Sequence, residues 1–270
     1  MKATMMHTPM TVQLIMQHGE SVFPDSRVGV FDGENINHTS YSGIAANATR
    51  LANALARVGV RPRDRVGTFS WNNTAHMEAY LAIPAMGAIM HTVNIRLSPE
   101  HIAFVIHHAE DKDIILDASL QPLFEPVIPL LSTVRHVLLV GDGAPLSGLD
   151  SSSYEAQLAA SPDHYDWPEL DETAAAAVCY TSGTTGNPKG VVYSHRTTFV
   201  HSMASRAADT FAISERDRIL LLPPMFHANS WGLPYSGWFS GSDFILPGPH
   251  QQDAGISAMV RNARPTLTAM

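Results

Sequence analysis

The stretch of sequence that most constrains this chain is Tyr180-Thr181-Ser182-Gly183-Thr184-Thr185-Gly186-Asn187-Pro188-Lys189-Gly190. Its three glycines allow positive φ angles and a close approach of the main chain, which turns successive N–H groups toward an anion. The four hydroxyl groups of its serine and threonine residues can donate to phosphate oxygens or ligate Mg²⁺, and Lys189 adds one positive charge. Apolar runs at residues 174–180 and 191–193 flank it. The pattern predicts two strands joined by a loop that binds polyphosphate.

The loop is not a Walker A motif, which requires G-x-x-x-x-G-K-[ST], because here Lys189 follows Pro188 and precedes Gly190. A surface linker rich in serine, threonine and glycine is the alternative interpretation. The lysine and the two flanking apolar runs favour the nucleotide site.

Composition excludes several classes of function. The 270 residues carry a formal net charge of −8, which argues against a nucleic-acid surface, and the 14 histidines show no zinc-ligand spacing. The only cysteine, Cys179, cannot form an internal disulfide and reads as a buried, inert thiol. The apolar run at residues 12–16 is too short for a secretory or membrane-spanning segment. We therefore expect a cytoplasmic protein with no transmembrane segment and no nucleic-acid partner.

Strand-like and helix-like segments alternate along the chain, which predicts an α/β fold with largely parallel sheets covered by helices. Ser40 and Ser98 have the character of helix N-caps. The expected strands cover residues 27–31, 66–70, 114–116, 136–140, 218–222 and 244–246. Further helices are expected at residues 74–87, 197–210, 231–240 and 253–261.

Loops rich in glycine, proline and serine at residues 141–153 and 161–168 suggest a division of the chain. We predict a first α/β subdomain over residues 1–170, and the phosphate loop with the start of a second subdomain over residues 171–270. Residues 266–270 read as the beginning of another strand. We therefore expect the second subdomain to be incomplete at Met270.

Three segments together resemble the adenylate-forming (AMP-binding) superfamily, in particular its fatty-acyl-CoA synthetases. They are residues 180–196, Pro224-Met225-Phe226-His227-Ala228-Asn229-Ser230-Trp231-Gly232 and Asn94-Ile95-Arg96-Leu97-Ser98-Pro99-Glu100. The resemblance runs from about Ser26 to Met270 and implies the fold of the N-terminal domain of acyl-CoA synthetases. It also implies a two-step reaction in which a fatty acid and MgATP give an acyl-adenylate, and CoA then displaces AMP to give the thioester. ATP, Mg²⁺, CoA and a fatty acid are the expected cofactor and substrates.

The resemblance assigns roles to individual residues. It places His227 beside the reacting carboxylate and α-phosphate, so that His227 and Lys189 are the expected catalytic residues. The metal contact is open, with Thr184 as the candidate. Substrate binding is expected at Phe226, His227, Asn229 and Trp231, with Trp231 as a gate and Trp238 as a further channel aromatic, although aromatic residues at these spacings also suit a plain core. The β- and γ-phosphates are expected at Thr181, Ser182, Gly183, Thr184, Thr185, Gly186 and Lys189.

Later motifs of the superfamily, such as Tyr-Gly-x-Thr-Glu, do not occur before Met270. We therefore expect the C-terminal lid domain to be absent and the isolated chain to be inactive. A non-catalytic remnant that binds nucleotide weakly is one alternative. Another carboxylate-adenylating enzyme is the second, such as an aryl-CoA ligase, a luciferase-like oxygenase or a peptide-synthetase adenylation domain. Asn229 and Trp231 beside His227 favour the fatty-acid ligase over that second alternative.

Overall fold

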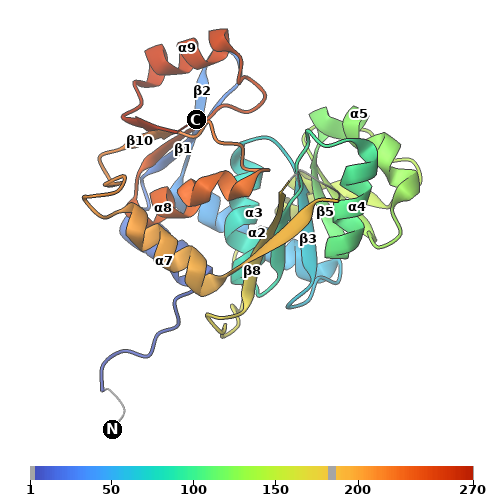
Figure 1. Cartoon of the computed structure of the whole chain (residues 1–270), viewed down its shortest axis with the longest axis horizontal. Helices are drawn as coiled ribbons and strands as arrows, with labels where there is room; N and C mark the ends of the chain where they lie inside the picture. Colours follow the sequence, from blue (N-terminus) through green and yellow to red (C-terminus); the bar gives the residue numbers. More distant parts are fainter. Residues whose placement is uncertain (1–3, 182–186, 270) are drawn as a thin grey trace.

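The computed structural model describes residues 4–181 and 187–269 and contains two β-sheets with a buried helix between them (Figure 1). The first sheet has the strand order β12-β10-β11-β1-β2, and all its neighbours are parallel except the pair β1–β2. Its strands are β1 Arg27–Phe31, β2 Ile36–Ser40, β10 Arg218–Leu220, β11 Asp243–Leu246 and β12 Leu267–Thr268.

The second sheet has the order β7-β6-β5-β3-β4-β8-β9, and only the pair β8–β9 is antiparallel. Its strands are β3 Arg65–Phe69, β4 Ile89–Thr92, β5 Asp111–Asp117, β6 His136–Val140, β7 Ser151–Ser153, β8 Ala175–Thr181 and β9 Lys189–Ser194. The predicted α/β fold with largely parallel sheets is confirmed.

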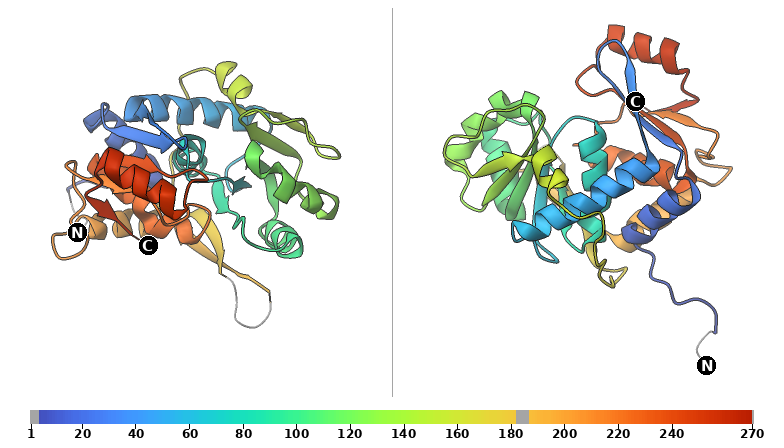
Figure 2. Two further views of the ribbon diagram at one scale, coloured as in Figure 1. Left: turned by 90° about the horizontal axis from the view of Figure 1, so that it is seen from above. Right: turned by 180° about the vertical axis from the view of Figure 1, so that it is seen from behind.

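Helices cover both sheets and separate them (Figure 2). The α-helices are α1 Val12–Val22, α2 Tyr41–Arg57, α3 Thr74–Ala85, α4 Pro99–Ala109, α5 Gln121–Phe124, α6 Tyr154–Ala159, α7 His195–Ser205, α8 Leu233–Ser240 and α9 Asp253–Ala263. Three 3₁₀ segments are η1 Ala118–Leu120, η2 Glu125–Leu130 and η3 Ala228–Gly232. Across residues 4–181 and 187–269, each helix is too short or too polar to cross a membrane.

Helix α3 joins the two sheets into one core. It is buried on all sides and contacts β1 of the first sheet and β3, β4 and β8 of the second. A helix that is apolar all round has no solvent face and belongs inside a protein. The largest cluster of buried side chains accordingly combines residues of α1, α2, α3 and α8 with strands of both sheets.

Successive parts of the chain contribute strands to both sheets. Strands β1 and β2 pair with β11 in the first sheet, whereas β8 and β9 pair with β4 in the second. The predicted boundary after residue 170 therefore does not coincide with the division between the sheets. A partition into subdomains 1–170 and 171–270 stays a prediction.

Several local predictions are confirmed and others need correction. Ser40 and Ser98 cap α2 and α4, because each hydroxyl accepts a hydrogen bond from the backbone N–H three residues on. The N-terminal helix α1 was not predicted: Thr11 caps it, and Val12, Ile15, Met16 and Gly19 form a buried stripe. Strands β2, β4 and β7 and helices α5 and α6 were not predicted either. Further differences lie at element ends: α7 stops at Ser205, β10 at Leu220, and α8 starts only at Leu233.

Candidate functional site

The predicted strand–loop–strand around the phosphate loop is a β-hairpin. Strands β8 and β9 pair antiparallel, with Thr181 opposite Lys189 and Tyr180 opposite Gly190. Thr181 and Lys189 are both exposed at the loop end of the hairpin, so a ligand can reach both side chains. The other predicted phosphate-binding residues lie outside the described residues: Ser182, Gly183, Thr184, Thr185 and Gly186.

The neighbouring pair of this hairpin, Tyr180 and Gly190, is packed closely. A Cβ atom on Gly190 would lie 3.2 Å from the ring of Tyr180, so the glycine leaves room for the ring across the pair. The Tyr180 hydroxyl is 2.7 Å from Nδ1 of His108 on α4. Burial raises the pKa of Tyr180 to about 12, so the group remains a neutral phenol. His108, in the last turn of α4, thus contacts the strand that leads into the phosphate loop.

His227 follows strand β10 of the first sheet and directly precedes η3. Its imidazole is half-buried, and its Nδ1 atom is buried without a hydrogen-bond partner among the described residues. A buried polar atom without a partner is unusual in a native protein and marks a place where a ligand can bind. This placement at the carboxyl end of a parallel strand matches the position where open α/β sheets bind ligands.

The residues after His227 form a left-handed turn, which includes Trp231, the first residue of the predicted helix at residues 231–240. Ala228, Asn229, Ser230 and Trp231 have φ angles of 46°, 48°, 50° and 56°. For residues other than glycine, the left-handed conformation costs about 1–2 kcal/mol each. Gly232, with φ 72°, ends the turn and caps α8.

Asn72, after β3, holds the connection that leads into this turn. Its Nδ2 atom donates to the carbonyls of Leu221 at 2.8 Å and Pro223 at 3.0 Å, and its Oδ1 atom accepts from Met225 N at 2.8 Å. Ser230 Oγ donates to the same Pro223 carbonyl at 2.7 Å. One fully buried amide thus fixes the chain from the end of β10 to His227.

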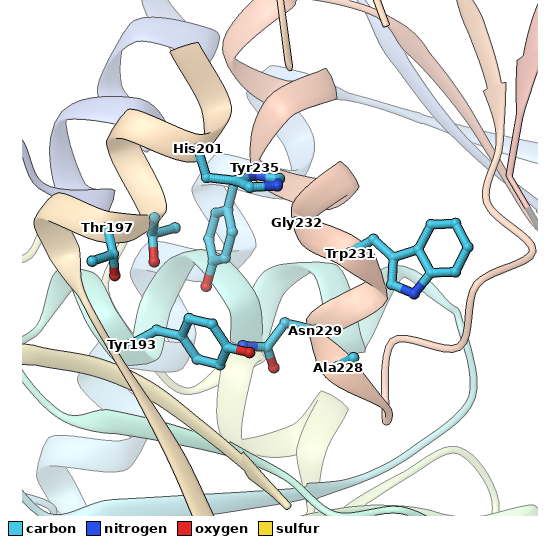
Figure 3. A pocket seen from close by; sticks show the side chains of 9 residues that line it. Tyr193, Thr197, His201, Ala228, Asn229, Trp231, Gly232 and Tyr235 are labelled. Atoms are coloured by element: carbon cyan, nitrogen blue, oxygen red, sulfur yellow. The ribbon is translucent and has the colours of Figure 1, made fainter. Parts of the chain in front are cut away.

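A cavity of about 440 Å³ lies beside this turn, between β9, α7 and α8. Figure 3 shows Tyr193, Tyr235 and Asn229 facing it from three different elements. Its lining is mostly apolar side-chain surface with a few hydroxyl and amide groups, which suits an organic ligand with a polar end. The lining residues are Tyr193, Thr197, Thr198, His201, Ala228, Asn229, Trp231, Gly232 and Tyr235.

The predicted aromatic residues divide between the cavity and the core. Trp231 lines the cavity and is 46% exposed, with its indole ring turned away from Tyr193 and Tyr235 (Figure 3). Phe226 is buried in the core beneath α4, and the Arg96 guanidinium lies 5.5 Å from its ring centre. Trp238 is wholly buried in the core.

The cysteine behaves as predicted. Cys179 is buried in β8, and its Sγ atom lies 3.9 Å from the Tyr193 hydroxyl. Burial raises the pKa of this thiol, which keeps it protonated and a poor nucleophile.

In the structure, the loop end of the β8–β9 hairpin, the His227 turn and the cavity lie near one another. The sequence analysis missed several residues of this site. Asn72, Thr92 and Tyr235 lie in no motif that the sequence analysis used. Tyr193 lies within residues 180–196, which carry the resemblance, but no role was assigned to it. The one available signal for a site residue was position, because Thr92 ends the parallel strand β4.

Within residues 4–181 and 187–269, no group of three or more His, Cys, Asp or Glu side chains is placed to hold a metal ion. Thr184, the predicted magnesium contact, lies outside those ranges.

Comparison with known proteins supports the family expectation. The chain is 38% identical over 99% of its length to a 3-methylmercaptopropionyl-CoA ligase of Ruegeria pomeroyi, and it covers 50% of that protein. It is 39% identical over 99% of its length to a long-chain-fatty-acid–CoA ligase of Thermus thermophilus, covering 48%. The chain thus spans about half the length of these curated relatives.

A solved structure with the same fold is an anthranilate CoA ligase in complex with anthranoyl-AMP. It superposes with a TM-score of 0.85 at 22% identity, covering 99% of this chain and 51% of that one. The family model described as AMP-binding enzyme matches residues 16–270. The phosphate-loop hairpin, the His227 segment and this match agree, and the chain belongs to the family of AMP-binding enzymes.

Proposed function

We propose that this chain forms the nucleotide- and acyl-binding portion of a fatty-acid–CoA ligase. Family membership supports adenylate chemistry, and the Thermus relative is named for a fatty-acid substrate. The observation that carries the proposal is the position of the β8–β9 hairpin, which lies beside both the His227 turn and a largely apolar cavity. Contacts between β8 and η3 support this proposal, because they bring the hairpin and the turn together.

The reaction joins two transfers. A carboxylate oxygen attacks the α-phosphorus of ATP, the bond to the β-phosphate breaks, and pyrophosphate leaves. The sulfur of CoA then attacks the acyl carbon, and AMP leaves with the electron pair of the broken bond. Such transfers depend on positioning and charge neutralisation more than on covalent help from the protein.

Five described residues have parts in this proposal. Lys189 opposes the negative charge of the β- and γ-phosphates, and Thr181 donates a hydrogen bond to them. His227 donates from its imidazole to the reacting carboxylate or the α-phosphate. Mg²⁺ supplies charge neutralisation on the phosphates when bound, and the hydroxyl groups of the phosphate loop suit such a hard cation. Asn229 and Trp231 bind the acyl group at the cavity.

A shorter carboxylate is the alternative substrate, because the Ruegeria relative is named for 3-methylmercaptopropionyl-CoA. The cavity discriminates between the two by the apolar surface that it buries, since each buried methylene group contributes about 0.8 kcal/mol. Binding of butanoate, octanoate and palmitate to the chain, measured calorimetrically, tests this choice. Affinity that rises with chain length supports a fatty acid. Equal or falling affinity supports the short carboxylate.

Lys189→Met tests the nucleotide site. We expect it to weaken binding of a non-hydrolysable ATP analogue about tenfold, the effect of losing one charge-assisted contact of about 1.4 kcal/mol. Lys112→Met is the matched control, because Lys112 lies near the start of β5, at the opposite end of the parallel strands. Equal affinity in Lys189→Met and the unaltered chain would contradict the proposed role of Lys189.

Turnover is measured on the same samples as release of AMP in the presence of fatty acid and CoA. The inactivity of the 270 residues by themselves stays a prediction until that assay. A cytoplasmic location also stays a prediction.

A further inference from the structure

Two adjacent strands of the second sheet reach the left-handed turn Ala228–Trp231. Thr92 and Cys179 are register partners on β4 and β8. The Thr92 hydroxyl donates to Asn229 Oδ1 at 3.0 Å, and strand β8 contacts η3. Both strands therefore lie against the turn.

The contact from Thr92 is shielded from water. Thr92 is 1% exposed and Asn229 is 8% exposed. Breaking a buried hydrogen bond of this kind costs free energy, because the remaining polar atom is then buried without a partner. The bond also fixes the one residue type in the turn that tolerates the left-handed conformation, while the alanine, serine and tryptophan beside it disfavour that conformation.

Four such residues in succession persist only where the surroundings determine them. The described side-chain hydrogen bonds that secure the turn run from Ser230 to Pro223 and from Thr92 to Asn229. The first bond lies within the connection after β10, whereas the second anchors the turn to the other sheet. The anchor to the second sheet therefore sets how the turn lies against the cavity.

We propose that Thr92 is a positioning residue of the acyl site: its hydroxyl fixes Asn229 and, through it, the turn that forms one wall of the cavity beside His227. Thr92 itself does not line the cavity, whereas Asn229 does. The nature of the ligand rests on the proposed function. The anchoring of the turn does not.

Hydrogen exchange of the full chain tests the anchor. We expect Thr92→Val, which keeps the shape and removes the hydroxyl, to speed amide exchange in the peptide spanning Ala228–Gly232 about fivefold, as expected for one lost hydrogen bond. Thr92→Ser restores slow exchange. Thr68→Val is the matched control, because Thr68 is the register partner of Thr92 on β3 and its hydroxyl is 2.9 Å from His76 Nε2.

Should Thr92→Val fail to fold, Asn229→Gly removes the acceptor and keeps the backbone freedom that the turn needs. Unchanged exchange in the turn of a folded Thr92→Val or Asn229→Gly chain would overturn the anchor.

Binding to the same variants tests the positioning role. We expect Thr92→Val to weaken octanoate binding about fivefold while the affinity for an ATP analogue stays within twofold, and Thr92→Ser to recover octanoate binding. A purely structural role would lower both affinities together and would overturn the proposal, as would unchanged octanoate binding. An unaltered chain that binds no carboxylate contradicts the acyl assignment of the cavity. Hydrogen exchange still decides the anchor in that case.

Discussion

At the scale of single residues, Glu78 shows how burial sets a charge. It is 3% exposed in α3, and its oxygens accept hydrogen bonds from Tyr154 and Asn47. Burial raises the pKa of Glu78 to about 7, although both hydrogen bonds lower it. The folded chain therefore holds this proton more tightly than the unfolded chain, whose glutamate has the ordinary value of 4.5. The resulting contribution to stability is present below about pH 4.5 and is lost as the pH rises to about 7.

Glu78→Gln removes this titration and keeps groups that can bond to Tyr154 and Asn47. We expect its unfolding free energy, relative to the unaltered chain, to rise by about 2–3 kcal/mol between about pH 4.5 and about pH 8, since each pKa unit corresponds to about 1.4 kcal/mol. Urea denaturation across this range measures the difference. Glu34→Gln, at an exposed position, serves as control. A constant difference between Glu78→Gln and the unaltered chain would show that Glu78 does not titrate there.

At the scale of elements, the connection after β10 depends on one amide from the other sheet. Asn72→Ala leaves the Leu221 carbonyl and the Met225 N–H without a partner and removes one of the two hydrogen bonds to the Pro223 carbonyl. Each buried group without a partner costs about 1–3 kcal/mol. We expect a loss of about 3 kcal/mol or more in unfolding free energy. Asn72→Asp loses more at neutral pH, because a carboxylate oxygen then faces the carbonyls of Leu221 and Pro223.

Chemical denaturation compares both Asn72 variants with Asn37→Ala, whose side chain is exposed and bonds to Asp32. The control is expected to change stability by less than about 0.5 kcal/mol. An Asn72→Asp chain as stable as Asn72→Ala would mean that the two carbonyls do not depend on the amide.

At the scale of the whole molecule, segments from both ends of the chain share one core. The indole Nε1 of Trp238 donates to the Met16 carbonyl at 3.1 Å, and the ring stacks on Tyr41 with centroids 3.9 Å apart. Gly19 of α1 lies against the same indole, where a Cβ atom would come within 2.2 Å of Nε1. The packing of α1 on α8 therefore leaves no room for a side chain at this position.

In Gly19→Ala, helix propensity and core packing have opposite effects on the free energy of unfolding. Alanine favours a helix by about 1 kcal/mol over glycine, but overpacking a core costs about 1–3 kcal/mol. Because the clash is with a fully buried ring, we expect net destabilisation and a lower melting temperature. Gln17→Ala, on the exposed face of α1, is expected to be neutral or slightly stabilising. A stabilised Gly19→Ala chain would mean that α1 shifts away from Trp238 at little cost.

Local chemistry in the sequence determined much of this protein by itself. The caps at Ser40 and Ser98, the alternation of strands and helices, and the hairpin that carries Lys189 follow from neighbouring residues, because their hydrogen bonds and periodicities span a few positions. Only the tertiary structure decided the rest. Contacts of Asn72, Thr92 and Trp238 join residues more than a hundred positions apart. Such contacts form only when both sheets pack on α3, and at Ala228–Trp231 they help to hold four residues in the left-handed conformation.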